Sequence, residues 1–246
     1  MSRHLALRSG NPALKPSTFT NQFASQNEGV MTLNGTVNKT GISLLLVLVS
    51  AAYSWVTPAM HPLAMPSALI GFILAMVNVF KPQLGHIFVP AYALVQGVFL
   101  GTISMVFNKM YPGIVVQAVF LTFGTLGALL LAYKSGLIRA TENFKLGIFA
   151  ATGGIAFLYF INFVMGFFSS GIGIISSNNT MGILFSAFVV VIAALNLVLD
   201  FDFIEEGAEK GAPKYMEWYG AFGLLVTLIW LYLEILRLLA KLNSRR

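Results

Sequence analysis

Long apolar segments separated by short polar links fill most of the chain. Seven apolar stretches follow one another, and each is near the length of about 20 residues that an α-helix needs to cross a bilayer. The pattern therefore predicts an all-α fold, a polytopic integral membrane bundle of seven transmembrane helices. The predicted spans are residues 41–57, 64–80, 85–107, 113–133, 145–168, 180–203 and 216–240.

The segment before the first span has a different character. Residues 1–40 contain no sustained apolar run and are rich in Ser, Thr, Asn and Gln. They lack the short apolar core and small-residue cleavage site of a signal peptide, so we expect them to be retained. The links between spans are too short for an extramembrane domain. The sequence thus predicts a polar, largely flexible tail over 1–40 and a seven-helix membrane domain over 41–246.

Composition excludes several classes of protein. Of the 246 residues, 57% are hydrophobic and 10% are charged, whereas soluble domains carry roughly 25% charged residues. A soluble enzyme is excluded by this difference. The absence of cysteine excludes disulfides, cysteine metal sites and thiol nucleophiles. The net charge of +6 comes from basic residues in the links and termini, as in membrane topology signals, and predicts no nucleic-acid partner.

Lysine and arginine counts favour a cytoplasmic N-terminus, because basic residues are enriched in cytoplasmic links. The four basic residues of the C-terminus then lie on the other side if all seven spans cross. A re-entrant seventh segment would keep them inside and is the alternative; we favour seven full spans. The inside set is Arg3, Arg8, Lys15, Lys39, Lys81, Lys134, Arg139, Lys145, Lys210 and Lys214, against Lys109, Arg237, Lys241, Arg245 and Arg246 outside.

No arrangement of residues predicts catalysis or a bound cofactor. His61 and His86 have no His, Cys or carboxylate at metal-ligand spacing, and no Ser–His arrangement is visible. We expect no catalytic residue, no metal site and no enzyme activity.

Small residues at helix-packing spacing predict tight contacts between helices. Gly97 and Gly101 form a GxxxG motif, which allows two helix backbones to approach closely. Further close-approach points are expected at Gly124, Gly127, Gly153 and Gly154.

Most acidic residues gather at the end of the sixth span and beyond it. Asp200 follows an unbroken apolar segment, and Asn196 precedes it by four residues on the same helix face. A carboxylate at that depth should face the bundle interior and is a candidate proton- or cation-responsive switch. We expect Glu205, Glu206 and Glu209 in an ordinary solvated acidic loop between the sixth and seventh spans; if the helix continues instead, they share one face with Asp202. Glu234 is a second carboxylate within a span, and an ion pair with Arg237 is its simpler explanation.

Several of these segments resemble the Bax inhibitor-1 family, the transmembrane BAX inhibitor motif proteins. "ALNLVLDFDFIE" and "YLEILRLL" resemble the end of that family. The segments that resemble its divergent bacterial branch are "GNPALKPSTF", "MTLNGTVNKT", "YPGIVVQAVFLTFGTLGALLLAY" and "IRATENFKLGIFAATGGIA". The resemblance covers about 30–246 and implies a seven-helix bundle with a central last helix, acting as a pH-sensitive calcium leak. It also implies the plasma (inner) membrane of a bacterium.

The resemblance implies a pair of pH-sensing aspartates, of which this chain has one. Asp200 matches the aspartate of helix six, whereas the aspartate of helix seven falls on Thr227. A threonine cannot share a proton with Asp200, so a coupled titration of two carboxylates is not expected. Glu234 lies on roughly the same face as Thr227, but two helical turns, about 10–11 Å, further along.

Two functions follow from the residues and the resemblance. The leading hypothesis is a pH-sensitive calcium or cation leak in a lipid bilayer, with no cofactor and with calcium as the transported ion. Its candidate pH-sensing or ion-pathway residues are Asp200, Asn196, Asp202, Glu234 and Thr227. The alternative is a non-conducting regulatory protein that binds other membrane proteins, such as proteases or stress factors.

Overall fold

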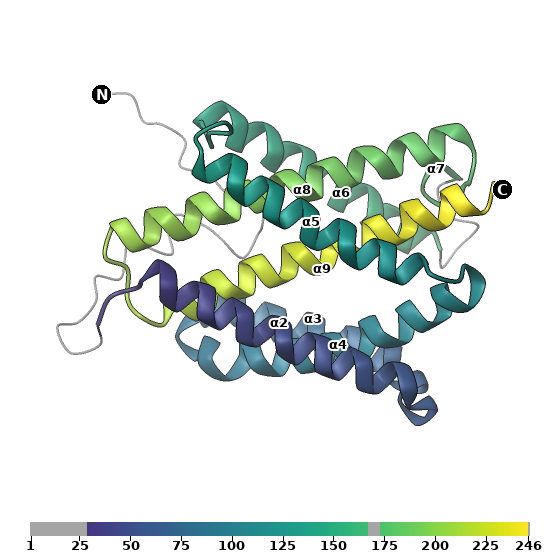
Figure 1. Cartoon of the computed structure of the whole chain (residues 1–246), viewed down its shortest axis with the longest axis horizontal. Coiled ribbons are helices and arrows are strands. Elements are labelled where there is room, and N and C mark those ends of the chain that lie inside the picture. Colours follow the sequence, from purple (N-terminus) through teal and green to yellow (C-terminus); the bar gives the residue numbers. More distant parts are fainter. Residues whose placement is uncertain (1–28, 167–172, 246) are drawn as a thin grey trace. The chain divides into compact units, whose positions relative to one another are not determined.

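Helices make up nearly all of the part of the chain that the structure describes. A computed structural model describes residues 29–166 and 173–245. Seven of its helical segments are long and apolar enough to cross a membrane, which confirms the predicted all-α polytopic bundle. The long helices are α2 (Leu33–Val56), α3 (Ala64–Phe80), α4 (Gly85–Met110), α5 (Ile114–Lys134), α6 (Glu142–Met165), α8 (Thr180–Glu209) and α9 (Met216–Asn243) (Figure 1). Short helices are η1 (Pro58–Leu63), η2 (Pro82–Leu84) and α7 (Gly173–Ser176).

Two predicted boundaries differ from the structure by more than three residues. The first span was expected to begin at residue 41, but α2 begins at Leu33, where the Thr32 side chain caps the helix by accepting a hydrogen bond from the Gly35 amide. The sixth span was expected to end at 203, but α8 continues to Glu209. The acidic residues after Asp200 therefore lie on a helix and not in a loop.

Polar residues at the start of α2 explain the first difference. The buried face of this helix includes Thr36, Thr40 and Ser43, while Val37 and Leu45 are exposed. The three buried hydroxyls donate to backbone carbonyls one turn earlier, so they carry no unsatisfied donor into the bundle. Small polar residues inside and apolar residues outside are typical of helices in lipid. From Leu33 to residue 40, the polar side chains that were assigned to the tail belong to a helix with a packed polar face.

Some sequence predictions fall outside the described residues. These are the flexible behaviour of the tail over residues 1–28 and the last two residues of the predicted span 145–168.

The chain divides into two compact units. The α2–α4 unit comprises residues 29–110 and 200–226, and so includes the end of α8 and the start of α9. The α5–α6 unit comprises residues 111–199 and 227–245, with the beginning of α8 and the end of α9. α9 is the most buried of the seven spanning segments, with 61% of its most apolar stretch buried, followed by α8 with 50%.

Close approach of α2 and α4 holds the α2–α4 unit together. A Cβ added at Gly97 would lie 2.6 Å from the Val47 carbonyl oxygen, and one at Gly101 would overlap the Ala51 carbonyl. Ser54 Oγ also bonds across the interface, to the Val98 carbonyl at 2.9 Å and to Thr102 Oγ1 at 2.8 Å. The predicted GxxxG contact is therefore confirmed, with α2 as its partner.

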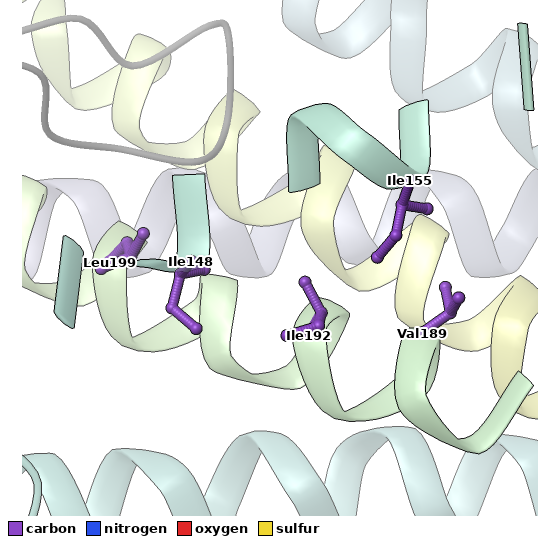
Figure 2. Close-up of a cluster of buried hydrophobic side chains, with 5 residues drawn as sticks. All are labelled: Ile148, Ile155, Val189, Ile192 and Leu199. Carbon is purple, nitrogen blue, oxygen red and sulfur yellow. The ribbon is translucent and has the colours of Figure 1, made fainter. Parts of the chain in front are cut away.

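The α5–α6 unit has an aliphatic core instead. Figure 2 shows this cluster of buried side chains, Ile148 and Ile155 from α6 with Val189, Ile192 and Leu199 from α8. Branched aliphatic side chains of this kind interlock at close packing density, which fixes how the two helices pair.

The other glycines expected to make close contacts do not make them. A Cβ added at Gly124, Gly127, Gly153 or Gly154 would meet no atom of the described residues within 4 Å. All four are exposed. The prediction is wrong for these positions because the spacing of small residues does not reveal which helix face meets a neighbour.

A matched pair of substitutions tests this distinction. Gly101→Ala should lower the stability of the folded protein by about 1–3 kcal/mol, because the new methyl group overlaps the Ala51 carbonyl. Gly124→Ala places the same methyl group in open space and should be neutral or raise stability by up to about 1 kcal/mol, through helix propensity. Thermal unfolding in one detergent would compare the two variants. Equal midpoints would contradict the assigned α2–α4 contact.

Candidate functional site

Asp200 lies on α8 and is fully buried, with 0% of its surface exposed. The segment of α8 that leads to it has no charged residue from Thr180 onwards, and Leu197, Val198 and Leu199 are all buried. An ionisable side chain in such surroundings carries a large desolvation cost and commonly marks a functional position. Asp200 is thus the carboxylate of the predicted set with the least access to solvent.

Asn196 precedes Asp200 by one helical turn and is bound to a neighbouring helix. Its Nδ2 donates to Thr152 Oγ1 of α6 and to the Ile192 carbonyl, both at 2.8 Å. Its Oδ1 is buried and accepts no hydrogen bond from the described residues. The Asn196 side chain therefore links α8 to α6 through its amide nitrogen, and its amide oxygen is available to accept a further hydrogen bond or to contact a cation.

The remaining acids of α8 are all more exposed than Asp200. Asp202 is half-buried, whereas Glu205 and Glu209 are exposed. Glu206 forms an ion pair with Lys210 one turn later. Because α8 is continuous to Glu209, these acids share a helix face and do not lie in the expected loop.

Glu234 lies in the α5–α6 unit, where it is 2% exposed. Arg237 Nη1 lies 3.0 Å from Oε1 of Glu234, and the Tyr159 hydroxyl donates to the same oxygen at 3.0 Å. Arg237 also donates to the Tyr159 oxygen at 2.7 Å and lies over the Tyr159 ring at 5.2 Å. The ion pair offered by the sequence is present, and Tyr159 from α6 completes it.

Lys241 is a buried cation that the sequence did not single out. Its Nζ donates to the carbonyl oxygens of Ile175 at 2.8 Å and Gly182 at 3.0 Å. It lies in the last turn of α9, where a positive charge is also favoured by the helix dipole. Within the α5–α6 unit it ties the end of α9 to α7 and the start of α8.

A second buried ion pair, in the α2–α4 unit, was also missed. Glu217 lies in the first turn of α9, is 1% exposed and pairs with Lys39 of α2. The backbone amide and hydroxyl of Thr32 donate to Glu217 Oε1 at 3.0 and 2.9 Å. Gly35 leaves the space for this carboxylate, because a Cβ there would overlap it. The carboxylate thus lies at the N-termini of two helices, where the helix dipoles favour negative charge.

Sequence alone gave little reason to join Lys39 and Glu217. They are 178 positions apart, and Lys39 fell in the segment interpreted as a flexible tail. The usable signal was a lone acid in the first turn of the last span, which requires a cation if it is buried.

The described part of the chain contains no candidate metal-binding site. In residues 29–166 and 173–245, no group of three or more His, Asp or Glu side chains is placed to hold a metal ion.

Comparison with known protein families gives a match over nearly the whole chain. A family model described as Bax inhibitor 1 like matches residues 11–244. The chain belongs to this family. It is therefore a Bax inhibitor-like integral membrane protein, as the segments quoted above indicated. A comparison with curated proteins finds no match.

At Thr227 this Bax inhibitor-like protein departs from the pair of aspartates that the resemblance implies. Thr227 lies on α9 in the α5–α6 unit and is 2% exposed. Its hydroxyl replaces the second aspartate that the resemblance implies. Glu234, the nearest substitute by sequence, is already bound by Arg237 and Tyr159.

The Glu217–Lys39 pair gives a testable prediction about stability. Glu217→Gln should destabilise the protein by about 3–5 kcal/mol, because it leaves a largely buried ammonium group without its counter-charge. Glu206→Gln is the matched control, since its pair with Lys210 is more exposed and contributes only about 0–1 kcal/mol. Adding Lys39→Met to Glu217→Gln should recover part of the loss. Unfolding measurements that rank both glutamate variants equally would contradict a structural role for this pair.

Proposed function

We propose that this Bax inhibitor-like protein is a pH-sensitive leak for calcium or a related cation, gated by protonation of Asp200. The observation that carries the proposal is a fully buried carboxylate at the end of a long apolar helix segment. Membership of the family supports it, because the resemblance implies the same activity and places an aspartate at this position.

The side chains of Asp200 and Asn196 on α8 are suited to a protonation-dependent interaction with a cation. Hard cations such as calcium prefer carboxylate and carbonyl oxygens, and protonation removes the charge of the carboxylate. Asn196 Oδ1 is a buried carbonyl oxygen with no hydrogen bond from the described residues. We propose that Asp200 provides the titrating charge and Asn196 a neutral oxygen on the path of the ion. Calcium is then cargo, and the proposal requires neither a cofactor nor catalysis.

The other candidates have smaller parts in this proposal. Glu234 is held by Arg237 and Tyr159, so it stabilises the bundle instead of sensing protons. Asp202 is half-buried beyond Asp200, where it would attract cations to the end of the path. Thr227 supplies no second carboxylate, and sensing therefore depends on Asp200 alone.

Calcium flux into proteoliposomes at several pH values tests the proposal. Asp200→Asn is nearly isosteric and cannot change charge, so the flux should lose its pH dependence. Glu209→Gln removes an exposed carboxylate from the end of the same helix and should leave the pH dependence unchanged. An Asp200→Asn variant whose flux still follows pH as in the wild type would disprove the sensor.

We also propose that the N-terminus is cytoplasmic, in the plasma (inner) membrane of a bacterium, and that the C-terminus is on the opposite side. Basic residues favour this orientation of the first six spans. The continuous α9 has 28 residues and is about 42 Å long, enough to cross a hydrocarbon core of about 30 Å.

Side-specific reporters fused to the C-terminus test this topology. A reporter active only outside the cytoplasm should be active there, and a cytoplasmic reporter should be silent. The reverse result would instead support a re-entrant last segment. A fusion within the link that holds Lys210 and Lys214 serves as the cytoplasmic control.

One observation favours the non-conducting alternative. The open glycines of α5 and α6 leave small-residue surfaces exposed, where another membrane protein, such as a protease or stress factor, could pack closely. Purified wild-type protein without calcium flux, together with a stable co-purifying membrane protein, would support this function over the leak.

A further inference from the structure

An apolar groove opens on the surface of the α2–α4 unit, beside the turn that joins α3 to α4. Its volume is about 360 Å³. The α3 side of the groove is a stripe of residues four apart, and Phe72 and Phe80 in this stripe are 60% and 78% exposed. The side chains that define it here are Phe72, Met76 and Phe80 from α3, Leu84 from η2 and Phe88 from α4, with Lys81.

The groove runs from the membrane boundary into the hydrocarbon. One spanning segment ends at Phe80 and the next begins at Pro82, so Lys81 lies between them at the level of the lipid headgroups. From Phe80 back to Phe72 an α-helix rises about 12 Å. An occupant of the groove therefore has one end among the headgroups and the rest in apolar surroundings.

Lys81 is the charged group of this groove. Its side chain is exposed, and it forms no ion pair or hydrogen bond with the described residues. The other lining residues are apolar, so the groove combines one unpaired cation at its mouth with an apolar wall. A molecule with an anionic head and a hydrocarbon chain is complementary to this arrangement.

The position of Lys81 at the headgroup level and its positive charge indicate which amphiphilic molecule fits the groove. Basic sites at helix ends on the cytoplasmic side attract the headgroups of anionic lipids. An extended protein segment is a poorer fit, because its backbone N–H and C=O groups would need hydrogen-bond partners at membrane depth, and Lys81 is the polar residue of the lining. An acyl chain has no polar groups to satisfy in the groove.

We infer that the groove between α3 and α4 is a binding site for an anionic phospholipid, with the phosphate on Lys81 and an acyl chain along Phe72, Met76 and Phe80. The site is separate from Asp200, and lipid binding here does not depend on whether the protein conducts calcium. Its occupancy would tie the α3–α4 turn to one leaflet of the bilayer.

Native mass spectrometry of the full-length protein in detergent tests the site. The probes are phosphatidylglycerol and phosphatidylcholine with identical acyl chains, and the measurement is the apparent Kd of the first bound lipid. We expect phosphatidylglycerol to bind more tightly, and Lys81→Gln to weaken its binding about fivefold. That change corresponds to about 1 kcal/mol for one lysine near an anionic headgroup. Lys134→Gln, which removes an exposed lysine from another helix end, should have no effect.

Two further variants separate the charge from the groove. Lys81→Arg keeps the cation and should retain the binding of phosphatidylglycerol. Met76→Trp fills the groove and should weaken the binding of both lipids. The inference is overturned if Lys81→Gln and Lys134→Gln bind phosphatidylglycerol equally, if the two lipids bind equally to the wild type, or if Met76→Trp leaves binding unchanged.

Discussion

Charges inside a bilayer must be neutralised, and this requirement shapes both units of the protein. An unpaired charged side chain at the centre of a membrane helix costs at least about 2.5–3.5 kcal/mol. In the α2–α4 unit, Glu217 meets Lys39 and the amide of Thr32. In the α5–α6 unit, Glu234 meets Arg237 and Tyr159, and Lys241 meets two backbone carbonyls. Each of these contacts ties an end of α9 to other helices.

Small residues make these contacts possible. Gly35 leaves room for the Glu217 carboxylate, and Gly97 and Gly101 allow α2 to approach α4. Apolar attraction contributes little between helices in lipid, so close packing and hydrogen bonds determine which helices associate. The hydroxyls of Ser54 and Thr102 add such bonds to the α2–α4 contact. In the α5–α6 unit, branched aliphatic side chains pack between α6 and α8, and the Asn196–Thr152 hydrogen bond joins the same two helices.

The proposed function and the stability of the protein depend on different carboxylates. Glu217 and Glu234 are bound by cations and therefore hold helices in place. Asp200 lies on a long apolar helix and occupies the position where the resemblance implies a sensor. Lys81 belongs to neither group, because its side chain is exposed and forms no ion pair with the described residues.

Hydropathy alone determined the number of spans, because about 20 apolar residues suffice for a helix to cross a bilayer, whatever its neighbours. The segments around Asp200 and Glu234 likewise indicated the family. Contacts between distant positions were decided only by the tertiary structure. Lys39 and Glu217 are 178 residues apart, and the four open glycines lie in apolar spans just as Gly97 and Gly101 do. The sequence reports which residues are small or charged, but pairing depends on which helix faces meet, and that is a property of the packed bundle.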